Sequence, residues 1–230
     1  MMLWKNDEEM FQLARRELFT AVAGDIMDKM GLQRQFLPPY IQPLDRQTVL
    51  VGRAMTVLEA DYHEETPSAS SNPILAKPFG LMLDALDQLR PNEIYVCTGG
   101  SPKYALWGEL MSTRALHCGA IGAVLDGYVR DTRGILAMGF PCFARGSYAQ
   151  DQAPRGKVID FRIAIEMDGT RVEPGDVIIG DIDGVCVIPR LAEQEVLERA
   201  LEKVRGEKVV RQALENGMSA RDAFEKFGIV

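Results

Sequence analysis

The chain has 230 residues, a formal net charge of −7 and a pI near 5.0, with 47% hydrophobic and 26% charged residues. This composition is typical of a soluble globular protein with a sizeable core. The acidic balance argues against nucleic acid as a partner, because phosphate binding needs a basic face. No apolar run approaches the roughly 18–20 residues of a membrane span. The N-terminus is too polar for a signal peptide, so we expect a cytoplasmic protein with no membrane partner.

Residues 8–30 are predicted to form two helices, the second with Thr20 as its N-cap and Gly31 as its stop. Residues 48–60 are rich in β-branched side chains and predict a strand. The polar, proline-bearing residues 61–78 predict a loop that is long enough to suggest a role.

Helical and strand patterns then alternate as far as residue 146, which indicates a parallel α/β layer. The predicted segments are a helix at 79–89, a strand at 93–98, a helix at 108–119, a strand at 123–125, a helical turn at 132–139 and a strand at 141–146. In such sheets the ligand lies beyond the carboxyl ends of the strands.

The pattern changes after residue 150. Residues 157–189 are rich in strand formers with Asp-Gly and Pro-Gly turns, and predict an antiparallel β unit folded onto the α/β layer. Residues 191–217 predict a long amphipathic helix, and Ser219 is a candidate cap for a short helical tail. We find no repeat or linker, so we expect one α/β domain that spans residues 1–230.

Neither cysteines nor histidines predict a metal centre. The four cysteines are far apart and are expected to be small apolar core residues of a reduced protein: Cys97, Cys118, Cys142 and Cys186. The two histidines are too few for a histidine-rich metal site. His117 lies in a helical stretch and is expected to be structural, and His63 lies in the polar loop.

Two loops carry the candidate chemistry. The first leads into a helix at Gly108-Glu109, whose first N–H groups lack intrahelical partners and could dock a small carboxylate. The second follows the strand in "GAIGAVLDGYVRDTRG" and carries Asp126, Arg130 and Asp131. Adjacent parallel strands would bring the two loops together.

Each feature has an ordinary explanation on its own. Glu109 is a favourable first-turn acid, and Arg130 with Asp131 could form a loop salt bridge. Together, Glu109, Asp126 and Asp131 would put three carboxylates near one arginine. Aspartate suits Mg²⁺ or Mn²⁺, and arginine grips carboxylates and enolates. Such a site suits a 2-oxo acid whose C–C cleavage leaves an enolate.

The same residues resemble the RraA-like family, which includes class II 4-hydroxy-4-methyl-2-oxoglutarate/4-carboxy-4-hydroxy-2-oxoadipate aldolases and regulators of ribonuclease E activity. The resemblance includes "TAVAGDIMDKMG", "GRAMTV", "GELM", "GAIGAVLDGYVRD", "FPCFARG" and "PGDVIIGDIDGVCVIP". Its most specific part is an acidic residue, twenty intervening positions and Arg-Asp, here Glu109 and Arg130-Asp131. The resemblance implies an α/β/β/α, swivelling-domain-like fold and a homotrimer or homohexamer with sites between subunits.

The resemblance also implies residue roles. The substrate carboxylate would be held by the amides of four consecutive residues: Gly108, Glu109, Leu110 and Met111. Arg130 would bind the substrate and stabilise the pyruvate enolate, and Asp131 would ligate the divalent metal. Glu109, and Glu207 from a neighbouring subunit's C-terminal helix, would hold water on that metal. The aldolases usually carry Asp where this chain has Glu109, which leaves the exact activity open.

The predicted function is a Mg²⁺-dependent lyase that cleaves a 4-hydroxy-2-oxo acid to pyruvate, with oxaloacetate decarboxylation as a side activity. The alternative is a non-catalytic regulator of the ribonuclease E type. Methyl transfer to a quinone precursor is disfavoured, because no glycine fingerprint for S-adenosylmethionine is present. Arg145 could assist at the next strand end, and Trp107 could line the pocket or pack in the core. The sequence leaves open the substituent on C4, the pathway, the preferred metal, and trimer against hexamer.

Overall fold

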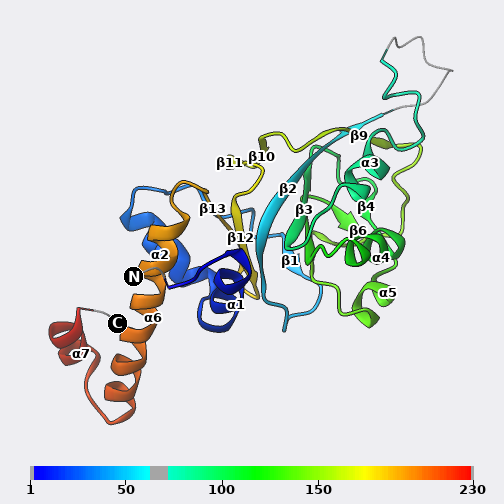
Figure 1. Ribbon diagram of the computed structural model, residues 1–230. Helices are drawn as coiled ribbons and strands as arrows, with labels where there is room; N and C mark the ends of the chain where they lie inside the picture. Colours follow the sequence, from blue (N-terminus) through cyan, green and yellow to red (C-terminus); the bar gives the residue numbers. More distant parts are fainter. Residues whose placement is uncertain (1–2, 63–71, 229–230) are drawn as a thin grey trace.

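The computed structural model describes residues 3–62 and 72–228. Its main sheet has the order β1-β7-β5-β3-β2-β12-β13, with β9 paired to β2 (Figure 1). The strands are β1 (Gln42–Pro43), β2 (Leu50–Asp61), β3 (Glu93–Thr98), β5 (Gly122–Leu125), β7 (Cys142–Ala144), β9 (Gly156–Phe161), β12 (Val177–Asp181) and β13 (Gly184–Ile188).

The sheet contains both parallel and antiparallel strand pairs, and this arrangement depends on the length of β2. Strands β2, β3, β5 and β7 are mutually parallel, as the alternating pattern predicts. Twelve residues allow β2 to pair antiparallel with β12 through its first part and with β9 through its last part. The expected antiparallel unit therefore exists, but it extends the parallel sheet instead of folding onto it. The hairpin of β10 (Ile165–Met167) and β11 (Thr170–Val172) stands apart from that sheet.

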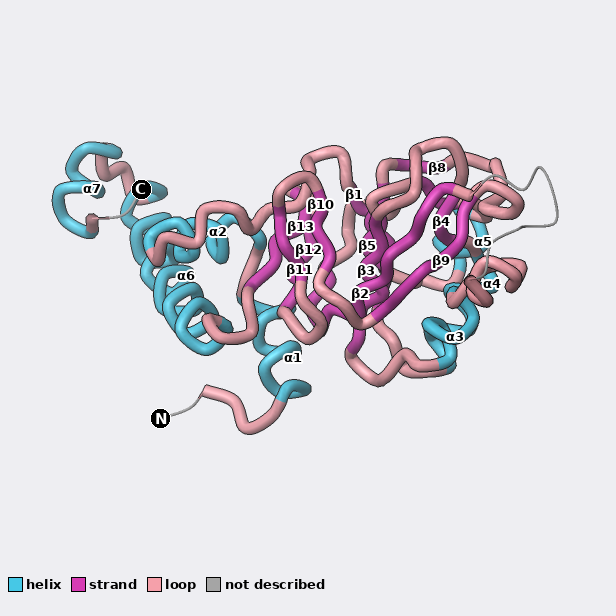
Figure 2. The backbone as a smooth tube through the Cα atoms, turned by 90° about the horizontal axis from the view of Figure 1, so that it is seen from above, coloured by secondary structure: helices cyan, strands magenta, loops and turns pink. Residues whose placement is uncertain are grey.

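Helices cover both faces of the sheet, which confirms the α/β class. They are α1 (Asp7–Glu17), α2 (Thr20–Lys29), α3 (Met82–Asp87), α4 (Glu109–His117), α5 (Thr132–Ala137), α6 (Glu193–Glu215) and α7 (Ala220–Phe227). Figure 2 shows α1, α2 and α6 on one side of the strands and α3, α4 and α5 on the other. No helix in the described part of the chain is long and apolar enough to cross a membrane.

The start of α2 differs from the prediction, because Phe19, not Thr20, is its N-cap. Thr20 is the first helical residue, and both its amide and its hydroxyl donate to the carboxylate of Asp181, at 2.7 Å each. Asp181 ends β12, so a side chain distant in sequence supplies the cap that a local threonine was expected to supply.

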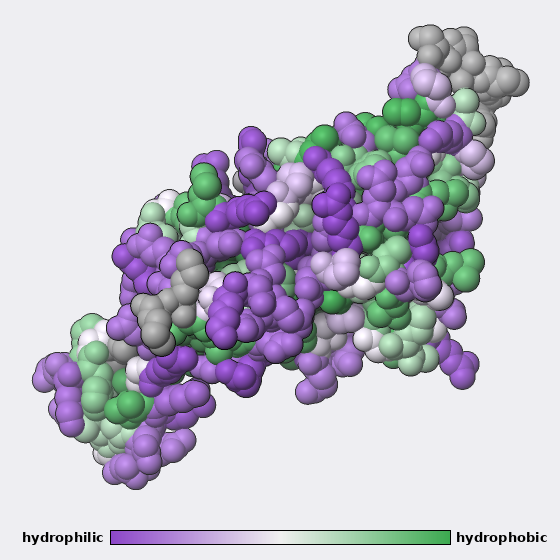
Figure 3. Space-filling model, viewed as in Figure 1, coloured by the Kyte–Doolittle hydropathy of each residue, from purple (hydrophilic) through white to green (hydrophobic). Residues whose placement is uncertain are grey.

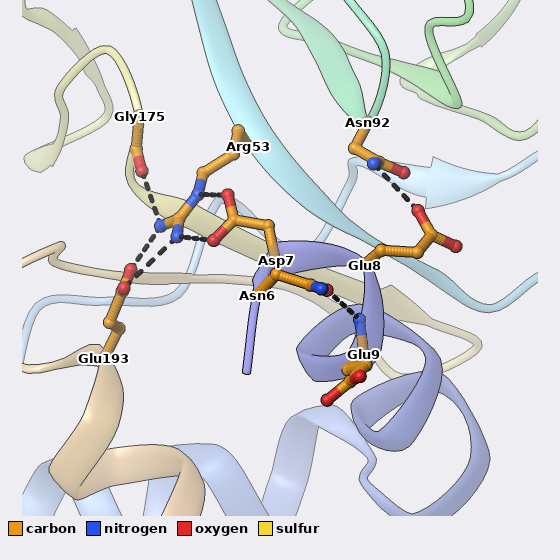
Figure 4. Close-up of polar contacts among 8 residues, drawn as sticks. All are labelled: Asn6, Asp7, Glu8, Glu9, Arg53, Asn92, Gly175 and Glu193. Atoms are coloured by element: carbon orange, nitrogen blue, oxygen red, sulfur yellow. Dashed lines mark hydrogen bonds and ion pairs between the residues drawn. The ribbon is translucent and has the colours of Figure 1, made fainter. Parts of the chain in front are cut away.

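One arginine joins the N-terminal and C-terminal helices to the sheet (Figure 4). Arg53 on β2 donates to Asp7 at the start of α1, at 2.7 and 2.8 Å, and to Glu193 at the start of α6. It also donates to the carbonyl of Gly175 at 3.1 Å. The Arg53 side chain is only 13% exposed, so these partners replace most of its hydration.

A second, three-stranded parallel sheet was not predicted. It consists of β4 (Ala105–Trp107), β6 (Tyr128–Val129) and β8 (Gly146–Ser147). Each strand continues the chain beyond the carboxyl end of a main-sheet strand, so the loops after β3, β5 and β7 are themselves paired. Trp107 is in register with Val129, which fixes the residues that follow both.

Candidate active site

A cavity of about 410 Å³ lies between α3, α4 and the loops that follow β4, β6 and β8. This volume is within the usual range for small-molecule sites. Gly108, Leu110, Met111, Arg130 and Asp131 all line it, so the structure brings these predicted residues together.

The second sheet produces this juxtaposition. The amide of Arg130 donates to the carbonyl of Trp107 at 2.9 Å, which places Arg130 and Asp131 beside the first residue of α4. A Cβ on Gly108 would lie 2.8 Å from Asp131 Oδ2 and 3.5 Å from Arg130 Cγ. The backbone of Gly108 is extended, a conformation that any residue adopts, so glycine is favoured here by the close approach of the Asp131 carboxylate and not by backbone strain.

Asp131 has a left-handed backbone conformation, with φ of 57°. Aspartate and asparagine tolerate this region better than other non-glycine residues, and such conformations cluster at functional sites. Because of this conformation, α5 starts directly after Asp131, and the carboxylate of Asp131 faces the start of α4. Asp131 Oδ2 lies 3.4 Å from the amide nitrogen of Glu109.

The start of α4 is only partly free to bind an anion, because the amide of Glu109, one of the four expected to hold the substrate carboxylate, already donates to Asp131 Oδ2. Its N-cap, Gly108, has no side chain to accept from the first amides. Among the described residues, none accepts a hydrogen bond from the amides of Leu110 and Met111. These amides and the positive end of the helix dipole are therefore free to bind a carboxylate.

Trp107 both lines the cavity and packs in the core. It is 1% exposed, its ring stacks on Phe140 at 5.9 Å, and it lies 4.8 Å from the ring of Tyr95. Its indole N–H donates to Ser112 Oγ at 2.7 Å, which fixes the first turn of α4. The two alternatives for Trp107 are therefore both correct.

Asp151 is a site residue that the sequence reasoning missed. Its Oδ1 lies 3.1 Å from Arg130 Nη1, and both residues line the cavity. Asp131 Oδ2 lies 3.7 Å from Arg130 Nε, so two aspartates flank one guanidinium. No local motif marks Asp151, because its loop reaches Arg130 only after β8 has joined the second sheet.

Glu109 does not line the main cavity. Its carboxylate points toward Gly134 on α5, and a Cβ on Gly134 would overlap the carboxylate of Glu109. Glu109 and Asp131 share a second, shallower hollow with Gly134 and Ala137. Asp131 therefore lies between the two hollows, with Arg130 on one side and Glu109 on the other.

Asp126 belongs to a separate cluster, so the expectation that it would join the carboxylates near Arg130 is wrong. Its carboxylate accepts from Arg145 at 2.7 Å, from the Tyr40 hydroxyl at 3.1 Å and from Thr98 at 3.0 Å. Arg145 also lies over the Tyr40 ring at 3.7 Å. These side chains form hydrogen bonds with one another at the strand ends of the main sheet. They do not line the cavity that contains Arg130.

The remaining predicted residues lie elsewhere. Glu207 is on α6, where it lies 3.6 Å from Lys203, and α6 is at the opposite side of the molecule from α4 (Figure 1). His117 is the exposed last residue of α4. His63 lies outside the described residues. The four cysteines are free thiols, three of them buried, as expected.

The carboxylates of the cavity fit a hydrated hard cation. Among the residues that the structure describes, no group of three or more His, Cys, Asp or Glu side chains could hold a metal by itself. Mg²⁺ does not require such a group, because it is commonly held by one or two carboxylates, several waters and the substrate. Asp131 and Asp151 could supply these carboxylates beside Arg130.

A buried acid supports one wall of the cavity. Glu59 on β2 is 3% exposed, and its Oε1 accepts from Gln152 Nε2 at 2.7 Å. Burial raises the pKa of Glu59 to about 8. Gln152 lines the cavity next to Asp151, so the hydrogen bond to Glu59 fixes the side chain of one lining residue.

The chain is 31% identical over 213 residues to a Halalkalibacterium halodurans protein named "Putative 4-hydroxy-4-methyl-2-oxoglutarate aldolase", covering 92% of each chain. A solved structure described as a novel cellulase from gut-associated microbes is 30% identical, with a TM-score of 0.79 over 89% of this chain and 87% of that one.

RraAS2 of Streptomyces coelicolor, an RNase ES inhibitor family member, shares the fold with a TM-score of 0.76 at 22% identity, over 90% of this chain and 98% of that one. The family model described as RraA-like, Aldolase/RraA, matches residues 20–187, which is well over half of the chain. The chain therefore belongs to the RraA-like family.

Proposed function

We propose that the protein is a divalent-metal-dependent lyase that cleaves a 4-hydroxy-2-oxo acid to pyruvate, with oxaloacetate decarboxylation as a side activity. One observation carries the proposal: Arg130 and Asp131 line the same cavity as the free amides at the start of α4. The name of the Halalkalibacterium halodurans relative supports the same reaction class.

The residues of the cavity have distinct roles in this proposal. The amides of Leu110 and Met111, with Arg130, bind the C1 carboxylate of the substrate. Arg130 also stabilises the negative charge that develops on the C2 oxygen when the C3–C4 bond breaks. Asp131, with Asp151, would hold the metal, which when bound supplies further positive charge for the same oxygen.

The reaction balances without an added reactant. The C4 hydroxyl loses a proton, the C3–C4 bond breaks, and C4 leaves as a carbonyl compound. The electron pair forms the enolate of pyruvate, which then gains a proton on C3. In oxaloacetate the same bond breaks and C4 leaves as carbon dioxide, so one enolate-stabilising site serves both substrates.

The test is pyruvate release from oxaloacetate and from 4-hydroxy-4-methyl-2-oxoglutarate, with Mg²⁺ and with EDTA. We expect turnover only with Mg²⁺. We expect Arg130→Ala to lower kcat/KM by at least ~100-fold, the scale for removal of one charge-stabilising donor. Arg171→Ala is the matched control, because the Arg171 side chain is 71% exposed and, in the part of the chain that the structure describes, forms an ion pair only with the nearby Glu173.

Unchanged turnover in EDTA would refute the metal-dependent mechanism. No pyruvate, together with tight binding to a ribonuclease, would favour a regulator, as the RraAS2 description suggests for that protein. Release of sugar from cellulose in place of pyruvate would favour the activity named for the other structural relative.

A further inference from the structure

The cavity beside Arg130 extends along α4 as an apolar channel. Six apolar side chains from α3, its approach and the first turn of α4 form its walls: Phe79, Met82, Leu83, Leu86, Leu110 and Met111. Leu110 and Arg114 line it from positions one turn apart, so this stretch of α4 is about 6 Å long. The surface over this end of the molecule has several hydrophobic areas (Figure 3).

Among the residues that line the channel, free backbone amides that could bind an anion are at one end only. The free amides of Leu110 and Met111 and the guanidinium of Arg130 are at the start of α4. At the other end, Arg114 Nε donates to Asp87 Oδ1 at 2.7 Å. Both arginines are therefore paired with aspartates, Arg130 with Asp131 and Asp151 as well as Arg114 with Asp87. The two ends differ because the described lining near Arg114 supplies no free helix amides that would add to the attraction of a carboxylate.

The charge of the lining favours a monoanion. Five charged side chains line the cavity, two of them arginines and three of them aspartates: Arg114, Arg130, Asp87, Asp131 and Asp151. Their formal sum is −1, and a bound divalent cation would change it to +1. One substrate carboxylate balances this charge, whereas two would exceed it.

From this arrangement we infer that the channel binds the C4 substituent of the substrate, and that it prefers an alkyl or aryl substituent to one that carries a second carboxylate, as in 4-hydroxy-4-methyl-2-oxoglutarate. The inference rests on the proposed function, because it places C1 at Arg130 and C4 toward α3. When a 2-oxo monocarboxylate with an apolar tail binds in this orientation, the tail is buried against the apolar side chains of α3 and α4 and is removed from water. Each buried methylene would add about fourfold in affinity.

Two uncleavable eight-carbon ligands test the inference by binding alone. They are 2-oxooctanoate, whose tail is apolar, and 2-oxosuberate, which has a second carboxylate at the same chain length. We expect isothermal titration calorimetry with Mg²⁺ to show 2-oxooctanoate binding at least ~10-fold more tightly. Cleavage of 4-hydroxy-2-oxo acids with the same two kinds of tail should show the same order in kcat/KM.

Two variants localise the effect. Leu83 is 57% exposed and lines the channel, so Leu83→Arg adds a cation without removing core packing. It should reduce the preference for 2-oxooctanoate by at least ~5-fold. Leu116→Arg is the control, because Leu116 is 45% exposed on α4 but does not line the cavity. It should leave the preference unchanged.

Equal binding of the two ligands, or tighter binding of 2-oxosuberate that is lost in Arg114→Met, would overturn the inference. This result is separable from failure of the lyase proposal. Absence of Mg²⁺-dependent pyruvate release from both oxaloacetate and 4-hydroxy-4-methyl-2-oxoglutarate would overturn the lyase. A retained preference for 2-oxooctanoate in the same protein would still support the apolar channel.

Discussion

Asp131 and Glu109 both line the shallower hollow, but they differ in their position relative to the cavity that contains Arg130. Asp131 lines both hollows and lies beside Arg130, whereas Glu109 faces only the shallower hollow. We expect Asp131→Asn to lower kcat/KM on oxaloacetate by at least ~100-fold and to weaken Mg²⁺ binding in calorimetry. Asparagine tolerates the left-handed backbone of this position, so the fold should persist.

Glu109→Gln provides the comparison, with an expected loss of no more than ~10-fold. This smaller loss is expected because Glu109 can reach a cation at Asp131 only through water. Equal losses in the two variants would show that Glu109 acts on the reacting atoms directly.

Glu59 is a single residue whose ionisation opposes folding. Its pKa is 4.5 ordinarily and about 8 in the folded protein. Between these values the folded state keeps a proton that the unfolded chain releases, so the contribution of Glu59 to stability falls as pH rises from about 4.5 to about 8. Glu59→Gln keeps an oxygen that accepts the hydrogen bond from Gln152, and it removes the loss of stability that ionisation of Glu59 causes.

We therefore expect Glu59→Gln to be more stable than the parent protein by about 2–4 kcal/mol at pH 8 and by little at pH 4.5. Urea unfolding at several pH values measures the difference. A difference that does not change with pH would contradict the assignment.

At the scale of elements, Arg53 fixes two helices to the sheet. Arg53→Met would leave the carboxylates of Asp7 and Glu193 without their cation. We expect a loss of about 2–3 kcal/mol in the free energy of unfolding at pH 7. The control is Arg16→Met, because Arg16 is 69% exposed and pairs only with its neighbour Glu17.

The pH dependence of this loss has a defined sign. Hydrogen bonds from Arg53 lower the pKa of Asp7 below its ordinary value of 3.8. The stabilisation by the ion pair is therefore complete above pH 3.8, and it disappears as the pH falls through the lower pKa that Asp7 has in the folded protein. The difference between the parent protein and Arg53→Met should narrow in that acidic range.

Elements with a clear periodicity could be predicted from the sequence, and the contacts that complete the site could not. The parallel strands and the start of α4 at Glu109 follow from local patterns. Strands β6 and β8 have two residues each, which is too short for any alternation to be recognised. Asp151 reaches Arg130 only through this small sheet.

At the scale of the whole molecule, Glu207 lies on α6, far from the cavity of its own chain (Figure 1). If a neighbouring copy supplies Glu207, two variants that are impaired in different subunits' parts of one site should complement each other. We expect a mixture of Arg130→Ala and Glu207→Gln subunits, exchanged in mild urea and then refolded, to regain part of the Mg²⁺-dependent pyruvate release.

Sedimentation velocity should give the mass of a trimer or hexamer for the same samples. No regain of activity in a mixture that sediments as a mixed oligomer would contradict a site shared between subunits. A monomer that retains full activity would have the same consequence.

The pairing of β2 with β12 has a consequence for synthesis of the chain. Arg53 pairs with Val177, 124 positions later. At about 5–20 residues per second, a ribosome would need roughly 6–25 s to make the intervening segment. For most of that interval the edge of β2 that later pairs with β9 and β12 has no neighbour and can bind other nascent chains. We therefore expect the yield of correctly folded protein on expression to respond to translation speed and to chaperone supply.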